Sequence, residues 1–327
     1  MKTSSLRRRI AVATAALGLL AALPCAFAQN PWPSRPIRLV VGFAPGGGTD
    51  VMARSLGQAL GEALGQPVVV DNKPGASGNI GAGEVVRAAP DGYTILLAPT
   101  SFQTVNPSLF KAPFDPAKDL TPLAAVGRSP MYIVARPTLE AKDAKELVAI
   151  ARKQPGKLSY ASSGSGTPPH LAGELFKQQA GIAAVHVPYR GSGPALQDVV
   201  AGQADYVFDP GIAFPHIRTG KVKLLAVTSA KRSAFFPDAP TLAEQGIKGA
   251  DMDIWWGVWV PNNTPPEVKA RLDREIAKAL ALANVKERYN GLGLEPAYLD
   301  AGAFRTLLAE ETKLLTKLIH DRGIKAD

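Results

Sequence analysis

Short apolar runs alternate with amphipathic stretches along most of this chain. The apolar runs have the length of single strands, and the stretches between them carry apolar residues at helical spacing. Such alternation predicts an α/β protein whose sheets are mostly parallel. The expected strands are 37–42, 67–70, 94–98, 131–135, 158–161, 184–187, 205–208 and 224–228.

One unit of this pattern occurs twice, at residues 37–70 and 158–187. Each copy has a strand, a Gly-rich loop, an amphipathic helix and a second strand, and Asp50 and His170 hold comparable places 120 residues apart. A strand that leads through a Gly-rich turn into a helix presents unpaired N–H groups and the positive end of the helix dipole, which favour an anion. Two such loops predict two lobes that close on an acid.

The two helix starts carry further signals. Apolar residues recur every four positions after Asp50, and Thr167 followed by Pro168 is a good N-terminal cap. Gly65 and Gly181 are expected to end these two helices. Glycines in these loops let the main chain approach a ligand, although a plain tight turn is the alternative. Asp50 is expected to organise its helix start. His170 is expected to support or border the pocket, with a role as a base as the alternative.

The chain begins with the layout of a secretory signal. Residues 1–28 have a basic opening, an apolar stretch from Ile10 to Leu23, and small residues around Ala28. We therefore expect export to the periplasm with cleavage near Ala28. Lipidation of Cys25 is the alternative, which Pro24 disfavours. The only cysteine would then leave with the signal, so the mature protein would have no disulfide.

Charge and motifs exclude several functions. Removal of four basic signal residues lowers the formal charge from +9 to +5, and the mature chain has no basic cluster of the kind that binds nucleic acid. The four histidines lack metal-ligand spacing, which predicts no metal. No P-loop, dinucleotide fingerprint or GxSxG elbow occurs, so no cofactor is expected and nucleotide binding is disfavoured.

Two chain crossings are expected between the lobes, near 125–129 and 253–260. The signal would then be 1–28. Lobe one would combine 29–127 with 254–327, and lobe two would be 128–253.

A series of blocks in a fixed order resembles a known family. These blocks include WPSRPIRLVVGFAPGGGTD, PAKDLTPLAAVGRSP, LSYASSGSGTPPHLAGELF and HVPYRGSGPALQDVVAGQADYVF. The succession resembles the Bug or TctC family, the extracytoplasmic solute receptors of tripartite tricarboxylate transporters. The resemblance implies a two-lobed, type II periplasmic-binding-protein-like fold with two mostly parallel sheets joined by crossing strands. It also implies a monomer without enzymatic activity that closes on a small carboxylate or dicarboxylate and delivers it to the transporter's membrane subunits.

The same resemblance assigns the site. It places Phe43, Ala44, Gly46, Gly47 and Asp50 on a first loop, and Ser163, Ser165, Gly166, Thr167 and His170 on a second. It adds Ala76, Ser77, Ser101, Tyr189, Arg190 and Asp209, the last at a position that varies with the solute. The last helix departs from the family at Leu315, where many relatives carry Trp, which bears on packing.

Two other functions stay open at this point. One is an exported hydrolase that pairs His170 with a serine of the SSGSG loop. The other keeps the receptor fold but presents the closed protein to a signalling partner.

Overall fold

The computed structural model describes residues 32–189, 191–291 and 293–325. Contacts divide the chain into a unit of residues 1–34 and a unit of residues 35–327, and the elements below all belong to the second unit. The predicted signal at 1–28 lies outside the described residues. No helix in the described part is long and apolar enough to cross a membrane.

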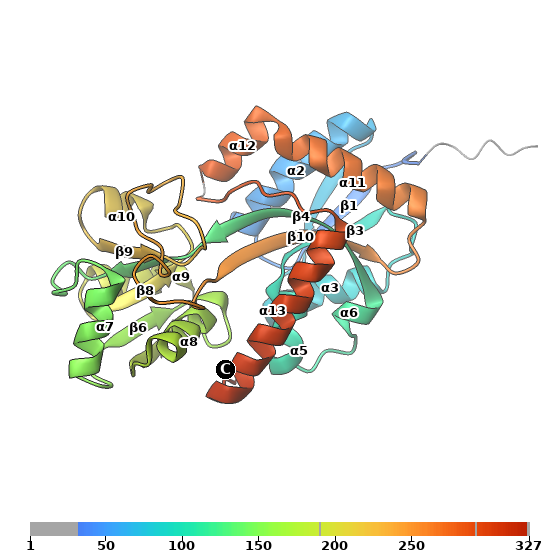
Figure 1. Ribbon diagram of the computed structural model, residues 1–327. Helices are drawn as coiled ribbons and strands as arrows, with labels where there is room; N and C mark the ends of the chain where they lie inside the picture. The colour runs from blue at the N-terminus through green and yellow to red at the C-terminus, as the bar shows by residue number, and fades with distance from the viewer. Residues whose placement is uncertain (1–31, 190, 292, 326–327) are drawn as a thin grey trace, which may run out of the picture. The chain divides into compact units, whose positions relative to one another are not determined.

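The first sheet has five strands in the order β2-β1-β3-β10-β4 (Figure 1). Four of them point the same way, and β10 is antiparallel to both of its neighbours. The strands are β1 (Ile37–Val41), β2 (Val68–Asn72), β3 (Thr94–Pro99), β4 (Leu120–Pro130) and β10 (Asp253–Pro261). The connecting helices are α2 (Gly48–Leu64), η1 (Ala76–Gly78), α3 (Asn79–Val86), α4 (Ser101–Thr104), α5 (Asn106–Leu109) and α6 (Pro116–Asp119).

The second sheet repeats this arrangement in the order β7-β6-β8-β5-β9. Here β5 is the strand that runs against the other four. The strands are β5 (Tyr132–Ala135), β6 (Ser159–Ser162), β7 (Val185–Pro188), β8 (Tyr206–Asp209) and β9 (Lys223–Val227). The helices of this part are α7 (Ala144–Lys153), α8 (Pro168–Ala180), α9 (Ser192–Val200) and α10 (Phe214–Arg218).

The expected α/β architecture with mostly parallel sheets is confirmed. All eight strands expected from apolar runs form within one or two residues of their expected bounds. We call each sheet with its helices a lobe. The chain passes between the lobes where β4 ends at Pro130 and β5 begins at Tyr132, and returns in the segment that leads into β10. β4 and β10 lie side by side along their whole length (Figure 1).

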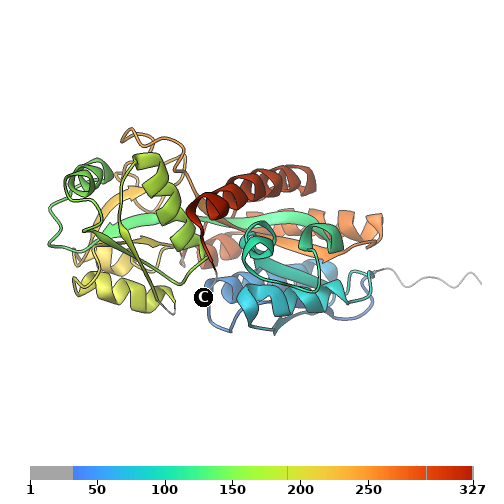
Figure 2. The same cartoon turned by 90° about the horizontal axis from the view of Figure 1, so that it is seen from below.

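The C-terminal helices complete the first lobe and reach the second. They are α11 (Pro266–Ala281), α12 (Ala283–Asn290) and α13 (Ala301–Arg322). The first half of α13 packs on the first sheet, where Phe304 and Leu308 join Trp259 in an apolar cluster. Its second half packs on α8, where Leu315 and Leu318 meet Leu171 (Figure 2). A single helix therefore contacts both lobes.

The predicted helix ends are also found. α2 ends at Gly65 and α8 at Gly181, and both glycines adopt the left-handed conformation that commonly closes a helix. Both helices begin beside the carboxyl end of a parallel strand, the edge at which open α/β sheets bind ligands.

Candidate functional site

The first Gly-rich loop is held in shape by Asp50. The N–H of Gly46, whose φ is +85°, donates to Asp50 Oδ2 at 2.9 Å. Arg54 Nε donates to the same oxygen at 2.9 Å, and Asn72 Nδ2 donates to Oδ1 at 2.9 Å. Burial alone would raise the pKa of Asp50, but these hydrogen bonds hold it below its ordinary value. Asp50 is therefore a charged brace behind the loop.

The loop that leads into α2 is exposed to solvent. No side chain caps the start of α2 by a hydrogen bond, and Gly47 precedes the helix in an extended conformation. The first N–H groups of a helix have no partner within the helix, and they lie at its positive end. The exposed loop at Gly47 and Gly48 thus presents main-chain donors, and Thr49 is fixed beside them because Trp256 Nε1 donates to Thr49 Oγ1 at 3.0 Å.

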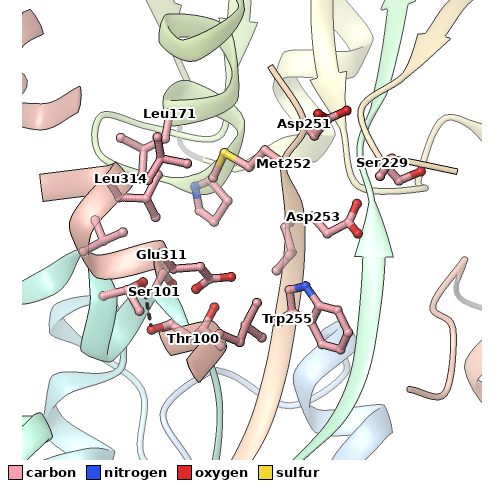
Figure 3. Close-up of a pocket in the computed structure, with 17 residues that line it drawn as sticks. Thr100, Ser101, Leu171, Ser229, Asp251, Met252, Asp253, Trp255, Glu311 and Leu314 are labelled. Carbon is pink, nitrogen blue, oxygen red and sulfur yellow. Dashed lines mark hydrogen bonds between the residues drawn. The ribbon is translucent and has the colours of Figure 1, made fainter. Parts of the chain in front are cut away.

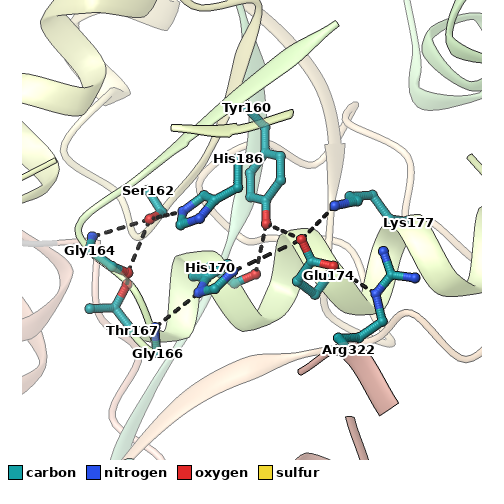
Figure 4. A network of polar contacts seen from close by, with 10 residues as sticks. All are labelled: Tyr160, Ser162, Gly164, Gly166, Thr167, His170, Glu174, Lys177, His186 and Arg322. Carbon is teal, nitrogen blue, oxygen red and sulfur yellow. Dashed lines mark hydrogen bonds and ion pairs between the residues drawn. The ribbon is translucent and has the colours of Figure 1, made fainter. Parts of the chain in front are cut away.

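The second loop is braced in the same way, by His170. The N–H of Gly166, whose φ is +75°, donates to His170 Nδ1 at 2.9 Å (Figure 4). Thr167 precedes α8 as expected, but its hydroxyl donates to the carbonyl of Gly164 at 2.6 Å instead of accepting from the helix. The cap predicted for Thr167 is therefore a link within the loop.

The two helix starts differ in the donors they offer. The first two residues of α8 are Pro168 and Pro169, and proline has no N–H group. This end of α8 therefore supplies its dipole rather than a row of amides. The prediction of two equivalent amide cradles is corrected in this respect, since the amides are concentrated at α2.

A cavity of about 510 Å³ lies between these loops. Of the predicted site residues, those that line it are Phe43, Gly46, Gly47, Ser77, Ser101, Ser163, Gly166 and Thr167. Among the described residues, none that lines the cavity carries a charged side chain. An anion bound there would be met by neutral donors and helix ends.

The other predicted residues that the structure describes do not line the cavity. Asp50 and His170 stand behind their loops. Tyr189 donates its hydroxyl hydrogen to Asp198 Oδ2 at 2.6 Å, which ties it to α9. Ala44, Ala76 and Ser165 do not line the cavity, although each is next or close to a residue that does. Arg190 lies outside the described residues.

Asp209 supports a third part of the wall. Its Oδ1 accepts the N–H groups of Gly211 and Ala213 at 2.8 and 2.9 Å, and so it shapes the turn that carries Pro210 and Ile212 into the cavity. Burial raises the pKa of Asp209 to about 6 in spite of these hydrogen bonds. Asp209 is 1% exposed, so it acts on the cavity through the turn that it holds rather than by touching a solute.

Several wall residues were missed from the sequence. Asn106 lines the cavity and donates to the Ser77 carbonyl at 3.0 Å and to Asn79 Oδ1 at 2.9 Å, which holds the η1 turn. Position at a strand end could have indicated Pro99 and Pro210, and alternation along β10 could have indicated Trp256. The missed residues are Thr49, Pro99, Asn106, Ser192, Pro210, Ile212, Ile254, Trp256 and Leu294, whereas Gly48, Pro168 and Pro169 lie within the two predicted loops and also line the cavity.

A second, smaller cavity of about 210 Å³ adjoins this one (Figure 3). It lies between α8, α13 and β10, and shares Ser101, Pro168 and Ile254 with the larger cavity. Leu315, the position at which the sequence departs from its relatives, is part of its wall. Three carboxyl side chains, those of Asp251, Asp253 and Glu311, line it, so the larger cavity with both Gly-rich loops is the better candidate for an anion site.

The arrangement gives no support to the hydrolase interpretation. His170 Nδ1 accepts the Gly166 N–H, and Ser162 Oγ lies 2.6 Å from Nε2 of a different histidine, His186. Ser162 is fully buried.

In the described part of the chain, no group of three or more His, Cys, Asp or Glu side chains could hold a metal ion.

Comparison with known proteins gives a consistent picture. The family model described as "Tripartite tricarboxylate transporter family receptor" (TctC) matches residues 52–324. The chain is 37% identical to protein BugT of Bordetella pertussis over 298 residues, which is 90% of this chain and 91% of BugT. Two solved structures from Rhodopseudomonas palustris are similar. Rpa4515 with adipate is 33% identical with a TM-score of 0.78 and covers 90% of this chain and 99% of its own. MatC with bound malate is 32% identical with a TM-score of 0.73, and the match covers 88% of this chain and 100% of MatC.

Proposed function

Because this chain belongs to the TctC family of receptors, which are periplasmic solute-binding proteins and not enzymes, we propose that it captures a small carboxylate or dicarboxylate in the larger cavity. The observation that carries the proposal is the uncapped start of α2, which faces a cavity lined by both Gly-rich loops. Main-chain donors at a positive helix end favour an anion.

The cavity is also large enough for such a solute. About 510 Å³ exceeds the volume of a short dicarboxylate and leaves room for ordered water. Adipate and malate, the compounds named with the two Rhodopseudomonas structures, are both dicarboxylates. Their presence in relatives supports this class of solute for this chain and leaves its particular solute open.

We further propose how the solute is gripped and released. One carboxylate would bind at residues 47–49, and the rest of the molecule would contact Ser163, Thr167 and the apolar wall of Ile254 and Trp256. The linker strands β4 and β10 would serve as the hinge, so that the lobes proposed at 29–127 with 254–327 and at 128–253 close around the solute. The closed receptor would deliver it to the membrane subunits of a tripartite tricarboxylate transporter. Export by a signal at 1–28 completes this proposal.

Isothermal titration calorimetry tests the proposed class of solute. Protein freed of any co-purified compound by unfolding and refolding would be titrated with malate, succinate, adipate and citrate. Dimethyl adipate and putrescine serve as uncharged and cationic controls of similar length. Saturable binding of at least one acid, with no binding of the controls and no chemical change of the acid, is expected. Equal binding of adipate and its dimethyl ester would contradict a site built for anions.

A further inference from the structure

We propose that His170 is a positioning residue that makes solute binding dependent on pH. In its unprotonated form Nδ1 holds the Gly166 N–H, and protonation of that nitrogen releases the second loop. This inference rests on the proposed function, because it concerns the affinity of the same cavity.

The geometry requires an unprotonated Nδ1. Gly166 N lies 2.9 Å from His170 Nδ1, and only a nitrogen that carries no hydrogen can accept this bond. Neutral histidine meets this condition when its hydrogen is on Nε2. Protonation would place an N–H opposite an N–H, and the bond would be lost. Histidine ordinarily titrates between pH 5 and 8, so the bond would fail within an accessible range.

The loop transmits this loss to the cavity. Gly166 and its neighbour Thr167 both line the cavity, whereas His170 does not. Gly166 also fits closely against the first lobe, because a Cβ atom there would lie 2.4 Å from Leu109 Cδ1. A shift of Gly166 would therefore change both the cavity wall and a contact between the lobes.

The first loop provides an internal comparison. Gly46 makes the same bond with Asp50, but a carboxylate accepts at any pH above its own pKa, and the pKa of Asp50 is lowered. Between pH 5 and 8 this brace does not change. Asp209, which shapes the third part of the wall, has a pKa raised to about 6 by burial. The contribution of the second loop is therefore isolated by comparing wild type with a His170 variant that keeps Asp209.

Charged and titratable groups surround His170 on four elements (Figure 4). On α8, Glu174 Oε1 lies 4.0 Å from His170 Nε2 and would favour protonation, but it already accepts from Lys177 at 2.6 Å. Arg322 of α13 and Tyr160 of β6 donate to the same carboxylate at 2.8 and 2.7 Å. Asp321 and Lys325 line a polar hollow that His170 and Glu174 also line.

The ring of His186 on β7 disfavours protonation of both histidines at once. It stacks on the ring of His170 with centroids 3.8 Å apart and an angle of 4° between the planes. Two charged rings at this distance would repel each other, so the pair should take up one proton before the other. Protonation of the pair is therefore expected to be stepwise, and the step that places a proton on His170 Nδ1 is the one that breaks the Gly166 bond.

Two substitutions separate the hydrogen bond from the charge. In His170→Asn, the amide oxygen can accept from Gly166 at every pH, since Asn Oδ1 can occupy the place of His Nδ1. In His170→Leu, no acceptor remains. His320→Asn changes a histidine whose side chain is 89% exposed, and serves as the matched control. Melting temperatures of all variants show whether the fold is kept.

The first measurement is the dissociation constant for adipate from pH 5.5 to 8. The titration of adipate itself affects every protein equally, so the comparison between proteins isolates His170. Wild type and His320→Asn should bind about fivefold to tenfold more weakly at pH 5.5, beyond any change seen in His170→Asn. His170→Leu should be weak at pH 8 as well. If the affinity of His170→Asn falls between pH 8 and 5.5 by the same factor as that of wild type, the proposal is overturned.

A second measurement needs no ligand. The NMR signal of the Gly166 amide in the free protein should shift with pH in wild type and in His320→Asn, and stay constant in His170→Asn. If adipate does not bind but this titration is seen, the proposed solute class fails while the role of His170 in the loop stands. A Gly166 signal with the same pH dependence in wild type and His170→Asn would overturn that role.

Discussion

Asp50 and His170 perform the same structural task in two separate loops. Each accepts the N–H of the glycine four residues before it, and the two distances are both 2.9 Å. Each glycine has a positive φ and lines the larger cavity. The two acceptors differ in chemistry, because one is a carboxylate held charged by its neighbours and the other is a titratable imidazole. The repeat therefore conserves geometry while it allows different responses to pH.

A first prediction concerns Gly47. Its φ is −79°, and a Cβ atom there would lie 3.7 Å from the Ala44 carbonyl, so Gly47→Val should fold normally. The added side chain would occupy space beside the donors at the start of α2. We expect the affinity for a bound carboxylate to fall by about 100-fold or more, measured by calorimetry.

The matched control is Gly291→Val. Gly291 also has an ordinary φ of −59°, and a Cβ atom there would lie 3.5 Å from the nearest carbonyl, but it does not line the cavity. This variant should bind as wild type does. Equal affinity of the Gly47 variant and wild type would remove this loop from the site.

A second prediction uses the tryptophans of β10. Trp256 lines the larger cavity and donates to Thr49, whereas Trp255 borders the smaller cavity on the other face of the strand. Binding should change the fluorescence of Trp256 by altering its surroundings. The change on titration should disappear in Trp256→Phe and persist in Trp255→Phe. A signal that persists in the Trp256 variant would contradict the proposed position of the solute.

A third prediction concerns the link between α8 and α13. Burial alone would raise the pKa of Glu174, but hydrogen bonds from Lys177, Tyr160 and Arg322 lower it to about 2. Because the folded pKa lies below that of the unfolded chain, this carboxylate stabilises the fold above about pH 4.3, and the contribution is lost as the pH falls toward 2. Glu174→Gln should cost about 3 kcal/mol at pH 7 in urea unfolding.

The pH dependence distinguishes this contribution from a simple packing defect. The difference in unfolding free energy between wild type and Glu174→Gln should shrink below about pH 4.3. Glu62→Gln, which changes an exposed glutamate on α2, should have little effect at any pH. A difference that stays constant from pH 7 to 3 would argue against an ionic role for Glu174.

A fourth prediction has the opposite sign and concerns Glu311, which points into the smaller cavity (Figure 3). Burial raises the pKa of Glu311 to about 7. A raised pKa means that the folded state loses stability, relative to a neutral variant, as the pH rises from about 4.3 through 7. Glu311→Gln should therefore gain stability relative to wild type between pH 5 and 8.

Melting temperatures of wild type and Glu311→Gln, measured at several pH values, test this gain in stability. Glu310→Gln, a change at the exposed neighbour on the same helix, provides the control and should follow wild type throughout. If the Glu311 variant also follows wild type at every pH, the carboxyl group is not held protonated in the fold.

Much of the fold follows from sequence pattern because strand periodicity and helix ends are local properties. The runs at 37–42 and 158–161 become β1 and β6, and Gly65 and Gly181 end their helices as expected. The pairing of β10 with β3 and β4 depends on contacts between residues far apart in the chain. The expected crossing near 253–260 located this strand, but apolar runs alone do not reveal that it reverses direction within the first sheet.

The site was predicted at the level of loops rather than of side chains. Gly46 and Gly166 could be found because glycine marks backbone that approaches a ligand. Whether a side chain reaches the cavity depends on tertiary packing, as Tyr189 and Asp209 show. Both lie in the expected loops, but one turns to α9 and the other braces its own turn. Asn106 and Leu294 have no local signal, since distant segments bring them to the wall.

The most direct test of the central claim is a crystal structure of the protein with a bound dicarboxylate such as adipate. We predict a carboxylate oxygen within hydrogen-bonding distance of main-chain N–H groups at residues 47–49, with the second loop at Thr167 on the opposite side of the solute. A solute bound elsewhere, or bound in the larger cavity with no contact to the start of α2, would contradict the account.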